Sequence, residues 1–116
     1  KVIMDLINNN ALDELRMMDE EGGFLKEIVN LFITDSVNTL EDMKKHAASG
    51  DIGALNKSAH KLKGSSLSIG AQALGEYCFT LEKMTVFEND DQKEQSMKDL
   101  QSLYDQSVEE LKKIIA

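Results

Sequence analysis

The chain has 116 residues, of which 41% are apolar and 29% charged, with seven glycines and no proline. This length suits a single domain, residues 1–116, with one core, and the composition is typical of a folded protein that favours helix. The net charge of −8, from 13 basic and 21 acidic residues, repels a phosphate backbone, so we exclude nucleic acid and an anionic membrane as main partners.

The first predicted helix is short and is followed by a glycine pair. A segment over about residues 10–20 carries Leu12, Leu15 and Met18 at helical spacing. Gly22-Gly23 then interrupts the pattern. We expect this short helix to cap one end of the fold.

The second predicted helix, about residues 24–48, has apolar residues over one wide face, broader than a narrow packing seam requires. The pair Ser49-Gly50 is a stop signal. His46 lies close to this end, where the negative end of the helix dipole favours a cation, and we predict this ordinary helix-end role for it.

Three further helices follow. Asp51 is predicted to cap the third helix, whose inward residues follow at spacings of three and four until Ile69, and Gly70 ends it. A fourth helix is expected over about residues 71–87 and a fifth over about residues 92–115, with a polar turn and cap between them.

Long amphipathic helices joined by short turns favour antiparallel neighbours. No segment of the sequence alternates with period two over a useful length. The predicted fold class is therefore all-α, an antiparallel four-helix bundle with a short additional N-terminal helix.

The only cysteine, Cys78, has no partner for an internal disulfide. We expect it to be a small buried apolar side chain in a reducing compartment. No apolar run approaches the roughly 20 residues that span a bilayer, and we expect no secretory leader. These observations favour the cytoplasm, and in a eukaryote the nucleus as well.

The stretch that carries chemistry is residues 59–66, A-H-K-L-K-G-S-S, in the third predicted helix. At about 100° per residue, His60, Lys63 and Gly64 lie roughly a third of a turn from the core stripe. The imidazole therefore faces solvent in the middle of a rigid helix. Lys63, at i+3, can reach a group bound to the imidazole.

Gly64 lies beside the same ring at i+4. Glycine inside a helix costs about 0.5–1 kcal/mol relative to alanine, and close approach by another surface is one physical reason to accept that cost. A solvated, inert His60 is the alternative interpretation of these residues, because His-x-x-Lys alone is a weak signal.

Residues 59–72, A-H-K-L-K-G-S-S-L-S-I-G-A-Q, resemble the signature of histidine-containing phosphotransfer (Hpt) domains. The closest likeness is to plant and fungal phosphorelay proteins, whose motif is H-x-L-K-G-S-S, then small residues, then G-x-Q. Weaker similarity extends upstream through residues 31–36 to the short first helix and downstream to Cys78.

The resemblance implies a helical bundle and a role for each matching residue. His60 would be the phosphoacceptor, Lys63 would stabilise the phosphoryl group, and Gly64 would provide clearance for a partner. Gln72, at the start of the fourth helix, would lie beside the imidazole as a hydrogen-bonding neighbour. Leu67 would belong to an apolar rim around His60.

The resemblance also implies an apolar docking surface near the imidazole. Leu15, Met18, Lys57 and Leu67 are the docking candidates. Lys61, at the variable position of the motif, is expected to be solvated. The alternative is that the whole apolar face of the first two helices is buried core, since wide stripes are normal for core helices.

By resemblance the chain is a phosphorelay intermediate, a phosphocarrier rather than an enzyme, without its own kinase or ATP site. His60 would accept a phosphoryl group from a receiver-domain aspartate and pass it to another receiver domain. The expected partners are response-regulator receiver domains and a hybrid histidine kinase, and the chain is expected to be a monomer. It would need no cofactor of its own, with Mg²⁺ on the partner receiver domain, and the sequence shows no glycine-rich phosphate loop.

Three other functions are compatible with a helical bundle of this kind. The phosphoacceptor domain of a chemotaxis-type histidine kinase has a similar His-x-x-Lys-Gly pattern. A structural or adaptor bundle with an inert His60 would take up no phosphate. A metal-binding bundle is disfavoured, because the sequence lacks paired Glu-x-x-His motifs.

Overall fold

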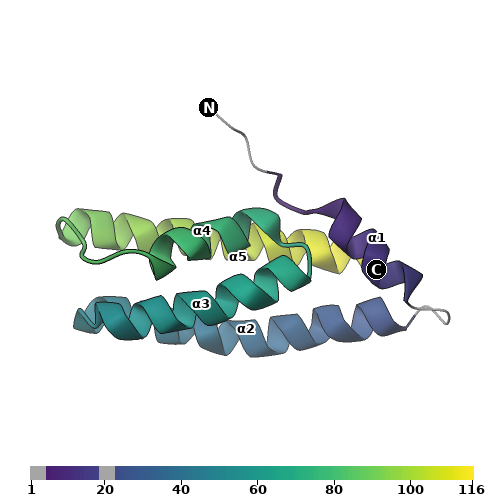
Figure 1. Ribbon diagram of the computed structural model, residues 1–116, viewed down its shortest axis with the longest axis horizontal. Helices are drawn as coiled ribbons and strands as arrows, with labels where there is room; N and C mark the ends of the chain where they lie inside the picture. Colours follow the sequence, from purple (N-terminus) through teal and green to yellow (C-terminus); the bar gives the residue numbers. More distant parts are fainter. Residues whose placement is uncertain (1–4, 19–22) are drawn as a thin grey trace.

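The computed structural model describes residues 5–18 and 23–116, and in these ranges it is all-helical. The elements are α1 (Asn9–Met17), α2 (Phe24–Ser49), α3 (Ile52–Ser68), α4 (Gln72–Glu82) and α5 (Asp90–Ile114). Helices α2 to α5 form an elongated antiparallel bundle, and α1 lies across one end of it (Figure 1). The predicted fold class is confirmed. No helix within the described ranges is long and apolar enough to cross a membrane.

Short-range signals set several of the helix ends. Asn8, Asp51 and Asn89 are N-caps, and the side chain of each accepts from the backbone N–H three residues ahead, at 3.2, 3.0 and 2.8 Å. Gly50 ends α2 with φ +76°, in the left-handed region that favours glycine. The predicted cap at Asp51 and stop at Gly50 are confirmed. The first helix ends at Met17, earlier than the expected end near residue 20, which itself lies outside the described residues.

The fourth helix is shorter than the sequence predicts, because it ends at Glu82 and not near Phe87. The apolar pattern continues past this point, so the pattern alone gives no stop. The end is set instead by another helix, since the Asn56 side chain of α3 donates to the carbonyl oxygens of Leu81 and Met84 at 2.8 and 3.0 Å.

The core lies between the four long helices and beneath α1. Each helix contributes a leucine that is at most 1% exposed, and α3 adds small residues at the predicted inward positions. The leucines in this set are Leu12, Leu40, Leu55, Leu62, Leu74, Leu81, Leu100 and Leu111. Because Ala59 belongs to the same buried stripe, its neighbour His60 must lie on the flank of α3.

Close backbone approaches hold α1 and α4 against α3. A Cβ on Gly70 (φ +82°) would lie 2.9 Å from the backbone oxygen of Asn8, and the Asn8 N–H donates to the Gly70 carbonyl at 2.7 Å. A Cβ on Gly75 would lie 2.5 Å from Leu67 Cδ2, so glycine lets α4 pack closely on α3. The two helices that surround the candidate site are therefore tightly joined.

Candidate functional site

His60 is at the midpoint of α3, and its side chain is 69% exposed. Eight helical residues on either side of it hold the backbone, so the ring is mounted on a rigid element. The expected solvent-facing position is therefore found. An exposed imidazole on a rigid helix is accessible to a partner without any change in the fold.

A carboxylate at the end of α4 contacts both the imidazole and the neighbouring lysine. Glu82 Oε1 lies 3.1 Å from His60 Nδ1 and 2.8 Å from Lys63 Nζ. Both contacts are short but bent away from ideal hydrogen-bond angles, and Oε1 itself is shielded from solvent. If Nδ1 carried a lone pair, that lone pair would face the negatively charged oxygen of Glu82 and be repelled by it. The geometry therefore favours the tautomer in which the proton is on Nδ1. Nε2 then carries the nucleophilic lone pair.

Lys63 is held from two sides. Its ammonium contacts Glu82 and lies 5.0 Å from the centroid of the Phe79 ring, within range of a cation–π interaction. The Lys63 side chain is only 20% exposed as a result. The Lys63 ammonium, and to a lesser degree His60, holds the pKa of Glu82 below its ordinary value, against the desolvation that raises it. The site therefore combines an imidazole, a carboxylate and a positioned ammonium.

Gly64 has open space where its side chain would be. A Cβ built there would meet nothing within 4 Å, and the residue is exposed in the middle of α3. Packing within the chain therefore gives no reason for a glycine here. The bare surface beside His60 leaves room for an approaching molecule.

The structure corrects the expectation for Gln72. Because α3 and α4 are antiparallel, Gly75 packs against Leu67, which is already seven residues from His60. Seven residues span about 10 Å of helix axis, and Gln72 lies farther away still. Its Nε2 donates to Glu76 Oε1 at 3.0 Å. The place beside the imidazole belongs to the carboxylate at the opposite end of α4.

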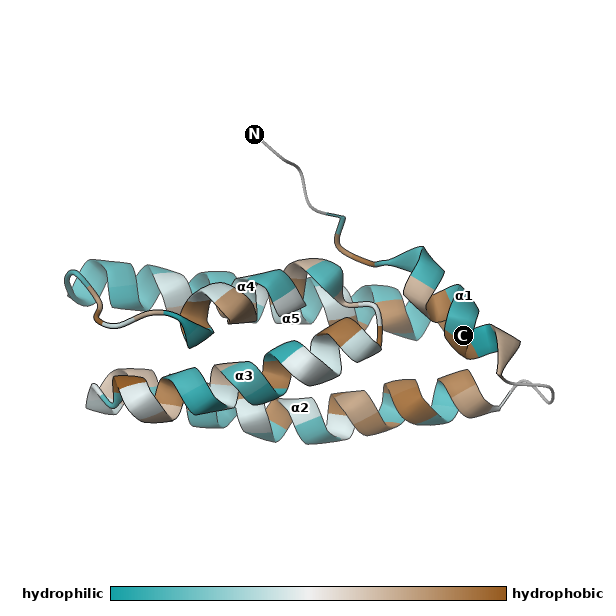
Figure 2. Cartoon of the chain, in the orientation of Figure 1, coloured by the Kyte–Doolittle hydropathy of each residue, from teal (hydrophilic) through white to brown (hydrophobic). Residues whose placement is uncertain are grey.

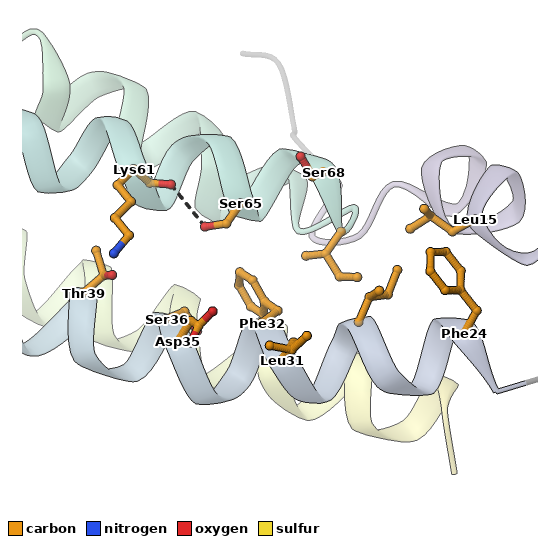
Figure 3. A pocket seen from close by; sticks show the side chains of 12 residues that line it. Leu15, Phe24, Leu31, Phe32, Asp35, Ser36, Thr39, Lys61, Ser65 and Ser68 are labelled. Atoms are coloured by element: carbon orange, nitrogen blue, oxygen red, sulfur yellow. Dashed lines mark hydrogen bonds between the residues drawn. The ribbon is translucent and has the colours of Figure 1, made fainter. Parts of the chain in front are cut away.

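A groove of about 450 Å³ lies between α1, α2 and α3 (Figure 3). Its apolar end is formed by α1 and the N-terminal half of α2, where brown residues gather in Figure 2. Its polar end includes Lys61 and Ser65, which lie on α3 one and five residues after His60. The lining residues are Leu15, Phe24, Ile28, Leu31, Phe32, Asp35, Ser36, Thr39, Lys61, Ser65, Ser68 and Ile69.

The four docking candidates are in different surroundings. Leu15 lines the groove and is half-buried, and Met18, just after α1, is 69% exposed. Lys57 is exposed one turn before His60. Leu67 is half-buried with its side chain against Gly75, so it packs between α3 and α4. The alternative in which all of this apolar surface is buried core is wrong, because Met18 is exposed.

Sequence reasoning missed three groups that the structure brings to the site. Glu82 belongs to no motif and reaches His60 only through the antiparallel pairing of α3 and α4. Phe24 and Leu31 are 40% and 53% exposed and line the groove. Their spacing with Ile28, at i, i+4 and i+7, was the available signal for this stripe.

Comparison with known proteins agrees with this geometry. The model of the Hpt domain family matches residues 27–115. The chain belongs to the Hpt domain family. Histidine-containing phosphotransfer protein 5 of Arabidopsis thaliana is 30% identical over 86 residues, which cover 70% of this chain and 55% of that protein. Phosphorelay intermediate protein YPD1 of Candida albicans is 31% identical over 74 residues, covering 63% of this chain and 40% of that protein.

This Hpt domain spans about half the length of the curated relatives it matches. Solved structures from bacteria and plants share its fold. HptB from Pseudomonas aeruginosa PAO1 aligns with a TM-score of 0.77 at 23% identity, covering 95% of this chain and 94% of that one. MtHPt2 from Medicago truncatula aligns with a TM-score of 0.75 at 22% identity, covering 95% of this chain and 76% of that one.

Proposed function

We propose that this Hpt domain is a phosphorelay intermediate, which accepts a phosphoryl group on His60 from a receiver-domain aspartate and passes it to another receiver domain. One observation carries the proposal: His60 is exposed in the middle of α3, with Nδ1 directed at Glu82 and Nε2 left free to react. The Lys63 ammonium next to this ring and the bare surface at Gly64 support the same assignment.

The transfer step follows from this arrangement. The Nε2 lone pair attacks the phosphorus of the aspartyl phosphate, and the bond between phosphorus and the carboxyl oxygen breaks, which releases the aspartate carboxylate. The imidazole becomes positively charged while the proton stays on Nδ1, and the Glu82 carboxylate stabilises that charge. The Lys63 ammonium has three N–H donors, so it can neutralise the phosphoryl oxygens without leaving Glu82.

We assign the groove between α1, α2 and α3 to the receiver domain. Its apolar end offers hydrophobic area, and its polar end lies beside His60, so a partner seated in the groove is brought to the ring. The partners in this proposal are response-regulator receiver domains and a hybrid histidine kinase, and the chain acts as a monomer. It is a phosphocarrier with no cofactor of its own, and Mg²⁺ belongs to the receiver.

The phosphoacceptor domain of a chemotaxis-type histidine kinase is the less favoured role. The relatives in sequence are named as phosphotransfer and phosphorelay proteins. The same site chemistry serves both roles, so phosphorylation by a receiver domain is the property that separates them.

The experiment that tests the proposal compares the two histidines. Incubation with a phosphorylated receiver domain should place acid-labile phosphate on the wild-type chain and on His46→Gln, and none on His60→Gln. His46 is the matched control, because it lies in the last turn of α2. Circular dichroism should show the same helix content in all three proteins. Labelling that survives in His60→Gln would overturn the assignment of the phosphoacceptor.

A further inference from the structure

A single side chain of α3 holds the C-terminal end of α4. Asn56 Nδ2 donates to the backbone oxygen of Leu81 at 2.8 Å and to that of Met84 at 3.0 Å. Both hydrogens of the carboxamide nitrogen are therefore used. The two accepting carbonyls lie on either side of Glu82 in the chain, so Asn56 clamps the segment that carries the carboxylate.

This clamp replaces a stop signal that the sequence of α4 lacks. The last carbonyls of a helix have no intrahelical partner, and they need one from elsewhere. No glycine follows Glu82, and the apolar pattern continues through Met84 and Phe87. The Leu81 carbonyl accepts from the Met84 N–H at 3.3 Å within the chain turn. Asn56 adds a side-chain donor to that carbonyl and to the carbonyl of Met84, so a tertiary contact fixes the end of α4 on α3.

The clamp and the nucleophile lie on the same helix. Asn56 is four residues before His60, one turn earlier on α3, whereas Glu82 contacts the site through the tip of its side chain alone. A small movement at the end of α4 is enough to take Glu82 Oε1 out of contact with Nδ1. The clamp thus sets the position of Glu82 relative to the imidazole.

We propose that Asn56 is a positioning residue for phosphotransfer, which places Glu82 against His60 by fixing the end of α4. The proposal rests on the function proposed for His60, but its first consequence, the tautomer of the ring, does not require phosphate. Asn56 contacts none of the reacting atoms. Its effect passes through Glu82, and this makes the proposal separable from a general loss of stability.

The first test uses Asn56→Ala and reads the ring directly. Nitrogen-15 NMR of the His60 imidazole should show the proton mostly on Nδ1 in the wild type and a mixture of tautomers in Asn56→Ala. Phosphorylation by phosphoramidate, a small donor that needs no docking, should slow about tenfold, since small misplacements of reacting groups cost up to about 100-fold. If Asn56→Ala fails to fold, Asn56→Ser keeps one donor and should give an intermediate mixture.

The matched control is Tyr104→Phe. It removes the buried hydrogen bond of 2.8 Å between Ser36 and Tyr104, which joins α2 to α5. This variant should lose stability yet keep the wild-type tautomer and phosphoramidate rate. An equal change in Tyr104→Phe would show that the ring responds to loss of stability in general, and would overturn the role of Asn56.

A double-mutant cycle with Glu82→Ala decides whether Asn56 acts through Glu82. Once Glu82 is removed, Asn56→Ala should cause no further change in rate or tautomer, because the contact it positions is gone. Additive losses would overturn the proposal, as would a wild-type tautomer in Asn56→Ala. By contrast, absence of label on wild-type His60 from every donor would overturn the phosphorelay function and leave the tautomer result standing.

Discussion

At the scale of single residues, the site depends on the charge contact between Lys63 and Glu82. Lys63 is the largest cause of the lowered pKa of Glu82, so Lys63→Ala should raise that pKa toward its ordinary value. Lys83→Ala is the matched control, because the Lys83 ammonium lies 4.5 Å from the centroid of the same Phe79 ring but is not among the groups that lower the pKa of Glu82. Carbon-13 NMR titration of the Glu82 carboxyl measures its pKa in both variants. A raised pKa in Lys83→Ala alone would contradict this account.

The sign of the pH dependence follows from the lowered pKa. A carboxylate with a lowered pKa in the folded protein contributes its stabilising contact above the ordinary glutamate pKa, about 4.3, and loses it as the pH falls through the folded value. The Glu82 contacts with His60 and Lys63 are therefore complete at neutral pH. In the proposed transfer, the Glu82 charge that would stabilise the imidazolium is therefore present throughout the neutral pH range.

In the proposed transfer, Lys63 also acts on the phosphoryl group. Removing it should slow transfer from a phosphorylated receiver by about 1–3 kcal/mol of barrier, the scale of a charge-assisted hydrogen bond, without abolishing transfer. Rapid-quench measurement of the transfer rate in Lys63→Ala tests this. A rate equal to that of the wild type would mean that Lys63 only holds Glu82.

Gly64 provides a test in which stability and activity change in opposite directions. Gly64→Gln should raise the melting temperature slightly, because glycine is costly in a helix and the site is open. It should also cut transfer from a receiver strongly while leaving phosphoramidate labelling intact. Gly53→Gln is the control: Gly53 is also exposed in α3, and a Cβ there meets only Asp51 Oδ1, at 3.8 Å. A wild-type rate of transfer in Gly64→Gln would show that the partner does not need the open space beside His60.

At the scale of elements, the packing of α4 on α3 depends on Gly75. A Cβ at this position would lie 2.5 Å from Leu67 Cδ2 and 2.7 Å from Cγ, so Gly75→Ala forces Leu67 to move. We expect a loss of about 1–3 kcal/mol in urea unfolding. The same change in open space, Gly64→Ala, should stabilise instead. Adding Leu67→Ala to Gly75→Ala should relieve the clash, so the two variants should lose less stability together than the sum of their separate losses. Additive losses of stability would show that Gly75 does not act through Leu67.

The elements also show which features the sequence can predict. The start, the core stripe and the stop of α3 depend on local signals, and all three were predictable from Asp51 to Gly70. The end of α4 was not, because its determinant, Asn56, is 25 residues away in sequence from the carbonyl of Leu81. The motif led to Gln72 as the neighbour of His60, whereas the antiparallel pairing of the helices places Glu82 there.

At the scale of the whole molecule, positive charge is concentrated around the imidazole of an acidic chain. Helix α3 has three lysines and no carboxylate, although the net charge of the chain is −8. Helix α5, which packs against α2 and α4 and so lies diagonally across the bundle from α3, has seven carboxylates and four lysines. Lys57 and Lys61 form no ion pair within the described chain. The bundle therefore presents its positive side together with His60.

This charge distribution predicts how a partner approaches. If the partner is a receiver domain, as proposed, carboxylates around its phosphorylated aspartate would be attracted to the α3 side. Lys57→Glu and Lys61→Glu should then each slow association about three- to tenfold at low salt. The effect should fade near 1 M salt, where screening acts within about 3 Å. Stopped-flow association rates over a salt series measure it. Lys112→Glu on α5 makes the same change in net charge away from His60, and an equal slowing in that variant would show that total charge, rather than its location, governs the encounter.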